Sequence, residues 1–178
     1  MITPALYRIW AKTRLMNLSA WTNSWKLEGM YAGHPGVGAQ DAWYSTAIDL
    51  EFAQCQNIPT VGGALDLYRC FDQILRPMLY LILGNSGLSV NVLGCYINFQ
   101  ERVGIRYLIK NTLGSIHFHR CGVPQGCPLS MVFVYIYLRA WMVQMAQYGS
   151  CPRALADDLL VTTMGHKALR VFTYVFNL

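Results

Sequence analysis

The chain of 178 residues is long enough for one sizeable domain or for part of a larger one. Its 54% hydrophobic and 13% charged residues exclude a disordered chain and indicate a well-buried core, with some apolar surface that something outside the chain covers. A formal net charge of +5 permits an anionic partner such as nucleic acid, although charge alone is weak evidence for one.

Cysteine spacing and hydropathy exclude further classes of protein. The six cysteines form no CxxC pair, so nothing predicts a zinc site or a dense disulfide framework, and we expect free, mostly buried thiols in a reducing compartment. No apolar run reaches the roughly 18 uncharged residues of a membrane span. The nearest run, residues 131–148, contains Arg139 and predicts a buried helix. Residues 1–15 mix charges among apolar residues, which is not the pattern of a signal peptide.

The first part of the chain predicts two helices, a loop and a strand. In chain order these are a basic amphipathic helix from Pro4 to about Trp25, a Gly-rich loop over 29–38, a helix over 39–55, and a short buried strand from residue 60 that ends at Asp66. The loop is not a P-loop, because no Gly-Lys-Ser/Thr follows it.

The rest of the chain mixes helices with short strands. The predicted elements are helices over 75–85 and 88–100, strands over 103–109 and 115–120, a Pro- and Gly-punctuated loop over 122–130, a helix from about 128, a hairpin over 153–163, and a final helix from about 167. Pro77 suits the first turn of the first of these helices. We therefore predict an α+β fold in which helices pack on one side of a few strands.

Three aspartates occupy positions that an apolar core would not accept without a reason. Asp157 and Asp158 lie inside the apolar run RALADDLLVTT, at the tip of the predicted hairpin, and Asp66 ends a predicted strand. A carboxylate in apolar surroundings costs several kcal/mol unless it is paired or binds a cation, and adjacent carboxylates repel each other. If the strands are neighbours, the carboxylates converge, and such hard oxygen ligands suit Mg²⁺. Two Mg²⁺ ions about 4 Å apart would clamp the attacking and leaving oxygens of a phosphoryl displacement.

Each of these residues also has a structural explanation. Adjacent aspartates are common in turns and at helix N-caps, and Asp66 alone could be a satisfied turn residue. His117 and His119 share one face of a predicted strand, but no third metal ligand is evident, so a surface pair is favoured there.

Three segments together resemble the palm motifs of reverse transcriptases of the non-LTR retrotransposon type. LDLYRCFD at 65–72, GVPQGCPLS at 122–130 and LADD at 155–158 occur in the order and spacing of that family, with Leu155 in place of its usual aromatic residue. Residues 2–15 and 33–51 resemble the fingers segments, so the resemblance covers nearly the whole chain. Viral RNA-dependent RNA polymerases match less well, because they usually have Gly-Asp-Asp and a Ser-Gly loop where this chain has Ala-Asp-Asp and Pro-Gln-Gly.

The resemblance implies a catalytic centre. Asp66, Asp157 and Asp158, joined by the backbone carbonyl of Leu67, would hold two Mg²⁺ ions, or Mn²⁺ in their place.

The resemblance also implies a nucleotide pocket. Phe71 takes the position of the aromatic steric gate that favours deoxynucleotides, and Arg69 would face the triphosphate. Gln125 and Gly126 would belong to the loop that shapes the nucleotide pocket. The alternatives are a core aromatic for Phe71, a solvated charge for Arg69 and an ordinary turn for the loop.

A basic cluster follows the second pair of helices. Arg102, Arg106 and Lys110 could neutralise template phosphates. Solvated helix faces explain these charges nearly as well.

The resemblance implies a right-hand polymerase palm, a small antiparallel sheet with helices on one face, together with partial fingers and no thumb. Partial fingers would cover about residues 1–60, and the palm with interleaved fingers elements about residues 61–178. The family's triphosphate-contacting Arg and its palm Lys are absent, since Lys167 lies too near Asp158 to be that Lys.

The expected function is that of an RNA-directed DNA polymerase core, which transfers nucleotides from dNTPs to a DNA primer 3′-OH on an RNA template. The alternative is an inactive, truncated retroelement remnant that at most binds nucleic acid. We expect no membrane association and an intracellular location. Retroelement enzymes often act in the nucleus, although no basic localisation run occurs here.

Overall fold

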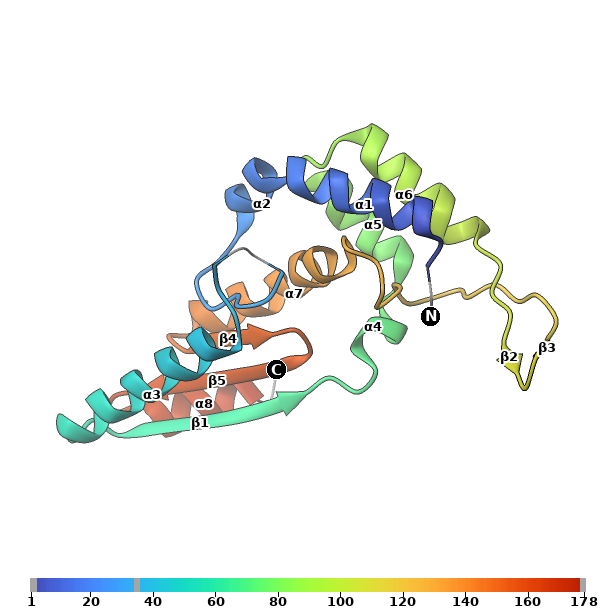
Figure 1. Cartoon of the computed structure of the whole chain (residues 1–178). Helices are drawn as coiled ribbons and strands as arrows, with labels where there is room; N and C mark the ends of the chain where they lie inside the picture. Colours follow the sequence, from blue (N-terminus) through green and yellow to red (C-terminus); the bar gives the residue numbers. More distant parts are fainter. Residues whose placement is uncertain (1–2, 34–35, 177–178) are drawn as a thin grey trace. The chain divides into compact units, whose positions relative to one another are not determined.

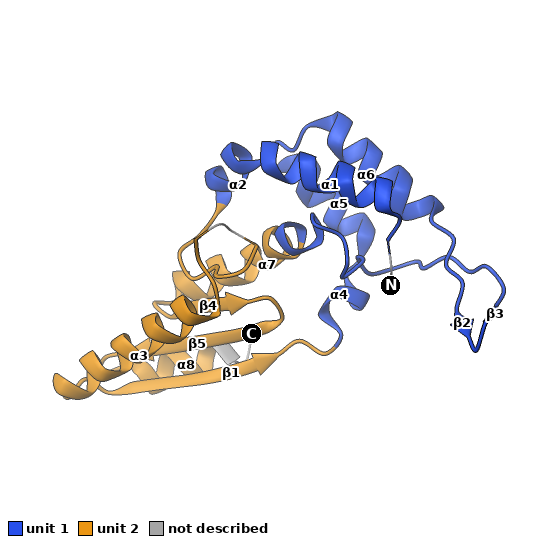
Figure 2. Cartoon of the chain, in the orientation of Figure 1, with its two compact units in different colours: residues 1–25, 69–133 blue, residues 26–68, 134–178 orange. Residues whose placement is uncertain are grey.

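The computed structural model describes residues 3–33 and 36–176. The chain forms two compact units that interleave along the sequence (Figure 2). Unit 1 comprises residues 1–25 and 69–133, and unit 2 comprises residues 26–68 and 134–178. The chain therefore crosses between units three times, the last time inside one helix, α7 (Ser130–Gln147).

Unit 2 is built on a three-stranded antiparallel sheet with the order β1-β5-β4 (Figure 1). The strands are β1 (Thr60–Asp66), β5 (Asp158–Met164) and β4 (Cys151–Leu155). The predicted strand that ends at Asp66 and the predicted hairpin are both confirmed. The prediction that β1 is buried is wrong: β1 is an edge strand whose alternate residues are exposed, because only one neighbour and one face cover it.

One face of this sheet carries its apolar core. Val161 of β5 is fully buried against Met145 of α7, and Trp141, Tyr148 and Val171 pack around this pair. Val171 belongs to α8 (Ala168–Phe176), which contacts both β1 and β5. The predicted final helix is thus confirmed.

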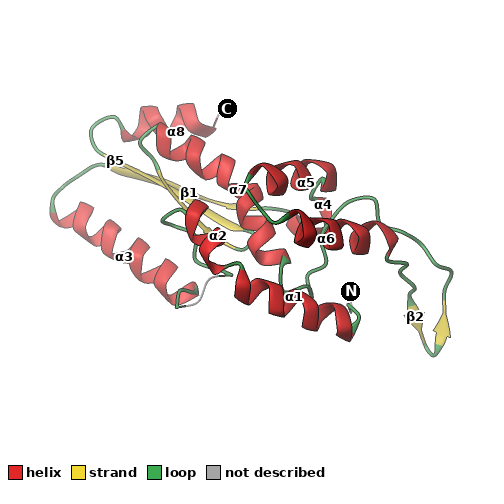
Figure 3. Cartoon of the chain, turned by 90° about the horizontal axis from the view of Figure 1, so that it is seen from above, coloured by secondary structure: helices red, strands yellow, loops and turns green. Residues whose placement is uncertain are grey.

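A helix also lies on the opposite face, which corrects the prediction that helices pack on one side only. Because side chains alternate along a strand, Arg153 of β4 points away from the Val161 face. Arg153 pairs there with Asp49 of α3 (Ala39–Cys55), so α3 and α8 lie on opposite sides of the strands (Figure 3). Burial alone would lower the pKa of Arg153, but the hydrogen bond to Asp49 and its charge raise that pKa above its ordinary value.

Unit 1 is mainly helical. Its helices are α1 (Ala5–Asn17), α2 (Ser19–Trp25), α4 (Cys70–Gln73), α5 (Arg76–Asn85), α6 (Val90–Arg102) and the start of α7. The ring of Tyr96 is fully buried and packs edge-on against Phe133, with 4.8 Å between ring centroids. The ring of Trp21 also packs edge-on against Phe133. Its Nε1 donates a 2.9 Å hydrogen bond to the carbonyl of Ser86.

The predicted single helix over residues 4–25 is divided at Leu18. The Leu18 N–H bonds to the carbonyl of Leu15, three residues back, which tightens and ends α1. This bend lets α1 bury Tyr7 and Ala11 while α2 buries Trp25. The helices predicted over 75–85 and 88–100 are confirmed within two residues at each end.

The two strands predicted over 103–109 and 115–120 are wrong in extent. Within residues 103–120 the structure has two short strands, β2 (Leu108–Ile109) and β3 (Thr112–Leu113), and one isolated bridge between Ile105 and His117. All four strand residues are exposed. A lone two-stranded hairpin with no covered face gains little from longer pairing, which explains the short ladder.

The structure also describes the burial of the cysteines and the length and apolarity of the helices. Among the described residues Cys127 is the only buried cysteine, so the expectation of mostly buried thiols is wrong. Cys70 is half-buried, and the other four cysteines are exposed. None of the helices in the described part of the chain combines the length and apolarity needed to cross a membrane.

Candidate functional site

One end of the unit 2 sheet brings the predicted aspartates together at the backbone level. Asp66 at the end of β1 lies directly opposite Asp158 at the start of β5. The N–H of Leu67 donates a 3.3 Å hydrogen bond to the carbonyl of Asp157. Asp66 and Asp158 are exposed and Asp157 is half-buried. The four residues predicted as metal ligands therefore occupy adjoining positions.

This arrangement is electrostatically unfavourable without a cation. Directly opposed residues share one face of an antiparallel sheet with Cβ atoms about 5 Å apart, and like charges there repel. The donors are carboxylates and backbone carbonyls, which Mg²⁺ and similar hard cations prefer. Within residues 3–33 and 36–176, no three His, Cys, Asp or Glu side chains close around one point. The donor type and backbone placement thus fit a hard divalent cation, with the side chains in an open arrangement.

The turn that carries Asp157 is strained. Ala156 and Asp157 form a two-residue connection between the paired residues Leu155 and Asp158. Ala156 has φ of 59°, in the left-handed region that glycine normally occupies. A non-glycine residue there costs about 1–2 kcal/mol, so surrounding contacts must hold this conformation.

Within unit 1, the predicted nucleotide loop, residues 122–130, is hydrogen-bonded to the backbone of Phe71, the predicted gate residue. The N–H of Val123 donates a 2.7 Å hydrogen bond to the carbonyl of Phe71, and the N–H of Gly122 bonds to the carbonyl of Ile74 at 2.8 Å. Gly122 has φ of +81°, and a Cβ there would lie 2.7 Å from the Asp72 carbonyl oxygen. Only glycine allows this close approach, so the glycine has a backbone role.

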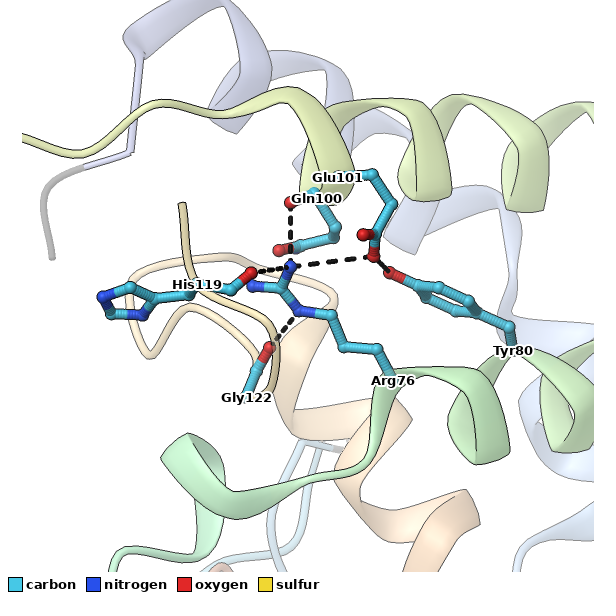
Figure 4. A network of polar contacts seen from close by, with 6 residues as sticks. All are labelled: Arg76, Tyr80, Gln100, Glu101, His119 and Gly122. Carbon is cyan, nitrogen blue, oxygen red and sulfur yellow. Dashed lines mark hydrogen bonds and ion pairs between the residues drawn. The ribbon is translucent and has the colours of Figure 1, made fainter. Parts of the chain in front are cut away.

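A buried arginine, Arg76, also hydrogen-bonds to this loop (Figure 4). Arg76 is 4% exposed, and its Nε donates to the Gly122 carbonyl at 2.7 Å. Its Nη1 donates to the carbonyls of Gln100 at 2.9 Å and His119 at 2.8 Å. Glu101 lies 3.6 Å from that nitrogen and balances the charge. One guanidinium thus joins α5, the end of α6, the end of the β2–β3 arm and the loop.

The far side of the loop is held by residues of the N-terminal segment. The hydroxyl of Tyr7 lies 3.2 Å from the Sγ of Cys127, and Thr3 donates to the carbonyl of Gly126 at 3.3 Å. Burial raises the pKa of Tyr7 well above its ordinary value, and the nearby Cys127 raises that pKa further. The Tyr7 hydroxyl therefore stays protonated. Gln125 and Gly126 remain exposed between these anchors.

The predicted basic residues are all exposed. Arg69 precedes α4 with φ of 49°, and its carbonyl accepts the N–H of Asp72 at 2.9 Å. Arg102 ends α6, and Arg106 and Lys110 lie on the arm that carries β2 and β3. The exposure of Arg102, Arg106 and Lys110 makes these side chains accessible to phosphates.

Sequence reasoning missed two supporting residues: Arg76 in unit 1, and Tyr135 in unit 2, whose hydroxyl hydrogen-bonds to the backbone of Ala154 and Ala156 beside the aspartates. Arg76 was part of a predicted helix, and Tyr135 was part of the predicted buried helix. For Arg76, the sequence offered one signal of a structural role, which is its charge within the apolar segment ILRPMLYLIL. Nothing in the sequence distinguishes Tyr135 from a core aromatic.

Comparison with known proteins gives a fold but no family. No protein-family model and no curated protein matches the chain. The chain is similar to the solved structure of apo telomerase from Candida tropicalis truncated from its C-terminal domain, with a TM-score of 0.66 and 14% identity over 97% of this chain and 37% of that chain. Telomerase from Candida albicans in complex with the TWJ fragment of telomeric RNA gives 0.61 and 15%, over 97% and 31%. The corresponding Candida tropicalis complex gives 0.63 and 12%, over 92% and 30%.

These similarities show a reverse-transcriptase-like fold. The identities are low, so the resemblance concerns fold alone. The chain spans about a third of the length of the telomerase structures that it matches.

Proposed function

We propose that this chain is the catalytic core of an RNA-directed DNA polymerase of the non-LTR retrotransposon type. About residues 1–60 would be part of the fingers, and about residues 61–178 would be the palm with interleaved fingers elements. The observation that carries the proposal is the cross-strand pairing of Asp66 with Asp158, with Asp157 in the adjoining turn. Such a cluster of opposed carboxylates is unfavourable for stability alone and suits a metal-dependent phosphoryl transfer.

In this proposal Asp66, Asp157 and Asp158 would hold two Mg²⁺ ions together with the carbonyl of Leu67. The bound ions would supply Lewis-acid stabilisation of the charge that develops on the transferring phosphoryl group. The protein's own part is to fix the backbone that carries these residues at the end of a paired sheet, from which the side chains would close around the ions.

The residues of unit 1 would select and orient the nucleotide. Phe71 would exclude a ribose 2′-OH, and Arg69 would face the triphosphate. Gln125 and Gly126 would shape the pocket, supported by the clamped loop that contains them. RNA template and DNA primer would be held in part by Arg102, Arg106 and Lys110, whose charges are exposed.

Replacement of one carboxylate tests the proposal. Asp157→Asn should lower primer extension on an RNA template by at least about 100-fold, because it removes a carboxylate that would hold the ions that stabilise the transition state. The unfolding midpoint should change little, since Asp157 is only half-buried. Glu51→Gln, which removes an exposed carboxylate from α3 in the same unit, is the matched control. Unchanged extension by Asp157→Asn would refute the catalytic assignment.

A second candidate is a protein that binds nucleic acid without polymerising it. The exposed cations on α6 and the β2–β3 arm favour this candidate independently of the aspartates. It predicts salt-sensitive RNA binding by the wild-type chain with no extension at all, and equal binding by Asp157→Asn.

A further inference from the structure

The connection between β4 and β5 needs a support that the aspartates do not provide. Ala156 holds a left-handed conformation, φ 59°, immediately before Asp157. Glycine is the residue that ordinarily takes the first position of such a two-residue turn. With alanine there, the turn keeps its shape only if other groups hold its backbone.

The hydroxyl of Tyr135 provides this support. Tyr135 lies on α7 within unit 2 and is 0% exposed. Its oxygen accepts the N–H of Ala156 at 3.0 Å and donates to the carbonyl of Ala154 at 3.0 Å. The hydroxyl thus bonds the last-but-one residue of β4 and the first residue of the turn, and fixes the backbone on both sides of Leu155.

A third bond ties the same hydroxyl to a neighbouring segment. The N–H of Ala32 donates to the Tyr135 oxygen at 2.8 Å. Gly29 accepts from the N–H of Ala154 at 2.8 Å, and Tyr31 donates to the Ala154 carbonyl at 3.0 Å, so residues 29–32 run beside β4. In these bonds the hydroxyl donates once and accepts twice.

These three hydrogen bonds join the hydroxyl to backbone groups, so they act on the geometry of the chain. Burial raises the pKa of Tyr135, while the bond from the Ala156 N–H opposes that rise. The hydroxyl remains a neutral donor and acceptor.

We propose that Tyr135 is a positioning residue that holds the backbone of the Ala156–Asp157 turn, from which the carboxylates of Asp157 and Asp158 would bind metal. The inference rests on the proposed function for its catalytic consequence. The claim that Tyr135 fixes the turn is independent of that function and rests on the three hydrogen bonds and on the left-handed conformation of Ala156.

Tyr135→Phe tests this inference, because it removes one oxygen and leaves the ring in place. Amide hydrogen exchange at Ala156 should become faster, while exchange in β1 stays as it is. Binding of Mn²⁺ alone to the chain, measured by electron paramagnetic resonance, should weaken about 10-fold, the scale expected when a support of metal ligands is lost. The rate of primer extension should fall by a similar factor with an unchanged KM for dNTP.

A control and a rescue separate positioning from general damage. Tyr137→Phe removes a hydroxyl two residues away on the same helix, where side chains do not share a face, and should match wild type. Ala156→Gly added to Tyr135→Phe should recover most of the Mn²⁺ affinity and the extension rate, since glycine adopts the left-handed conformation without support.

Two results would overturn the inference. One is wild-type exchange at Ala156, with wild-type Mn²⁺ affinity, in Tyr135→Phe. The other is a double variant that stays as impaired as Tyr135→Phe. If the wild-type chain neither binds Mn²⁺ nor extends a primer, the proposed function fails and the metal-binding arrangement fails with it. Exchange at Ala156 would then still decide whether the hydroxyl holds the turn.

Discussion

Phe71 is the single residue whose side chain would decide which sugar the proposed pocket accepts. Its ring is half-buried, and its carbonyl is fixed by the N–H of Val123, so the backbone beneath the ring has little freedom. A rigid aromatic side chain at a fixed position can reject one hydroxyl group by collision.

Phe71→Ala should therefore admit ribonucleotides. The ratio of kcat/KM for a dNTP to that for the matching rNTP should fall by about 10- to 200-fold, the range that one contact in a pocket provides. Steady-state incorporation of single nucleotides measures this ratio. Phe118→Ala, which removes an exposed ring from the β2–β3 arm, is the control. Equal discrimination by Phe71→Ala and wild type would make Phe71 an ordinary packing residue.

The sequence predicts some site residues better than others, for a physical reason. Asp66, Asp157 and Asp158 could be found because a carboxylate in an apolar run has few explanations. Arg76 and Tyr135 could not be assigned, because the hydrogen bonds that fix them go to backbone carbonyls and N–H groups, which leave no mark in the sequence. The positions of those backbone groups depend on tertiary structure.

Among the elements, the loop at 122–130 depends most on one side chain. Arg76 supplies donors to three carbonyls that otherwise have no charged partner, and these come from α6, the base of the arm and the loop. Lysine would keep the charge but lacks the planar fork that reaches several acceptors at once.

Arg76→Ala should lower the free energy of unfolding by about 3–5 kcal/mol, because it leaves three backbone carbonyls without their donor. Arg76→Lys should recover only part of this loss. Urea denaturation followed by circular dichroism measures both values. Arg8→Ala, at an exposed position on α1, should stay within about 0.5 kcal/mol of wild type. An Arg76→Ala variant as stable as wild type would show that the network contributes no net stability.

Elements with strong local signals were predicted, and those that depend on neighbours were not. The hairpin at 151–164 joins two largely apolar strands through a two-residue turn, and it was predicted over 153–163 with its aspartates at the tip. The arm around β2 and β3 is also rich in strand-forming residues, but no neighbouring sheet covers it, so its ladder stays short. The position of α3 on the second face of the sheet depends on the Arg153–Asp49 pair, which the sequence does not reveal.

The whole molecule has a reverse-transcriptase-like fold that three short motifs indicated from sequence. Those motifs divide between the units: the aspartates belong to unit 2, and Phe71 and the loop at 122–130 belong to unit 1. The residues proposed for metal binding and those proposed for nucleotide selection thus belong to separate packing units. Their variants should accordingly change different kinetic constants.

Templated synthesis by the wild-type chain tests the central claim most directly. The measurement supplies a DNA primer on an RNA template, Mg²⁺ and one dNTP at a time, and repeats the four reactions on templates that differ at the first unpaired base. The proposed polymerase should add only the complementary dNTP on each template. Failure to extend with any dNTP, or equal extension with all four on every template, would contradict it.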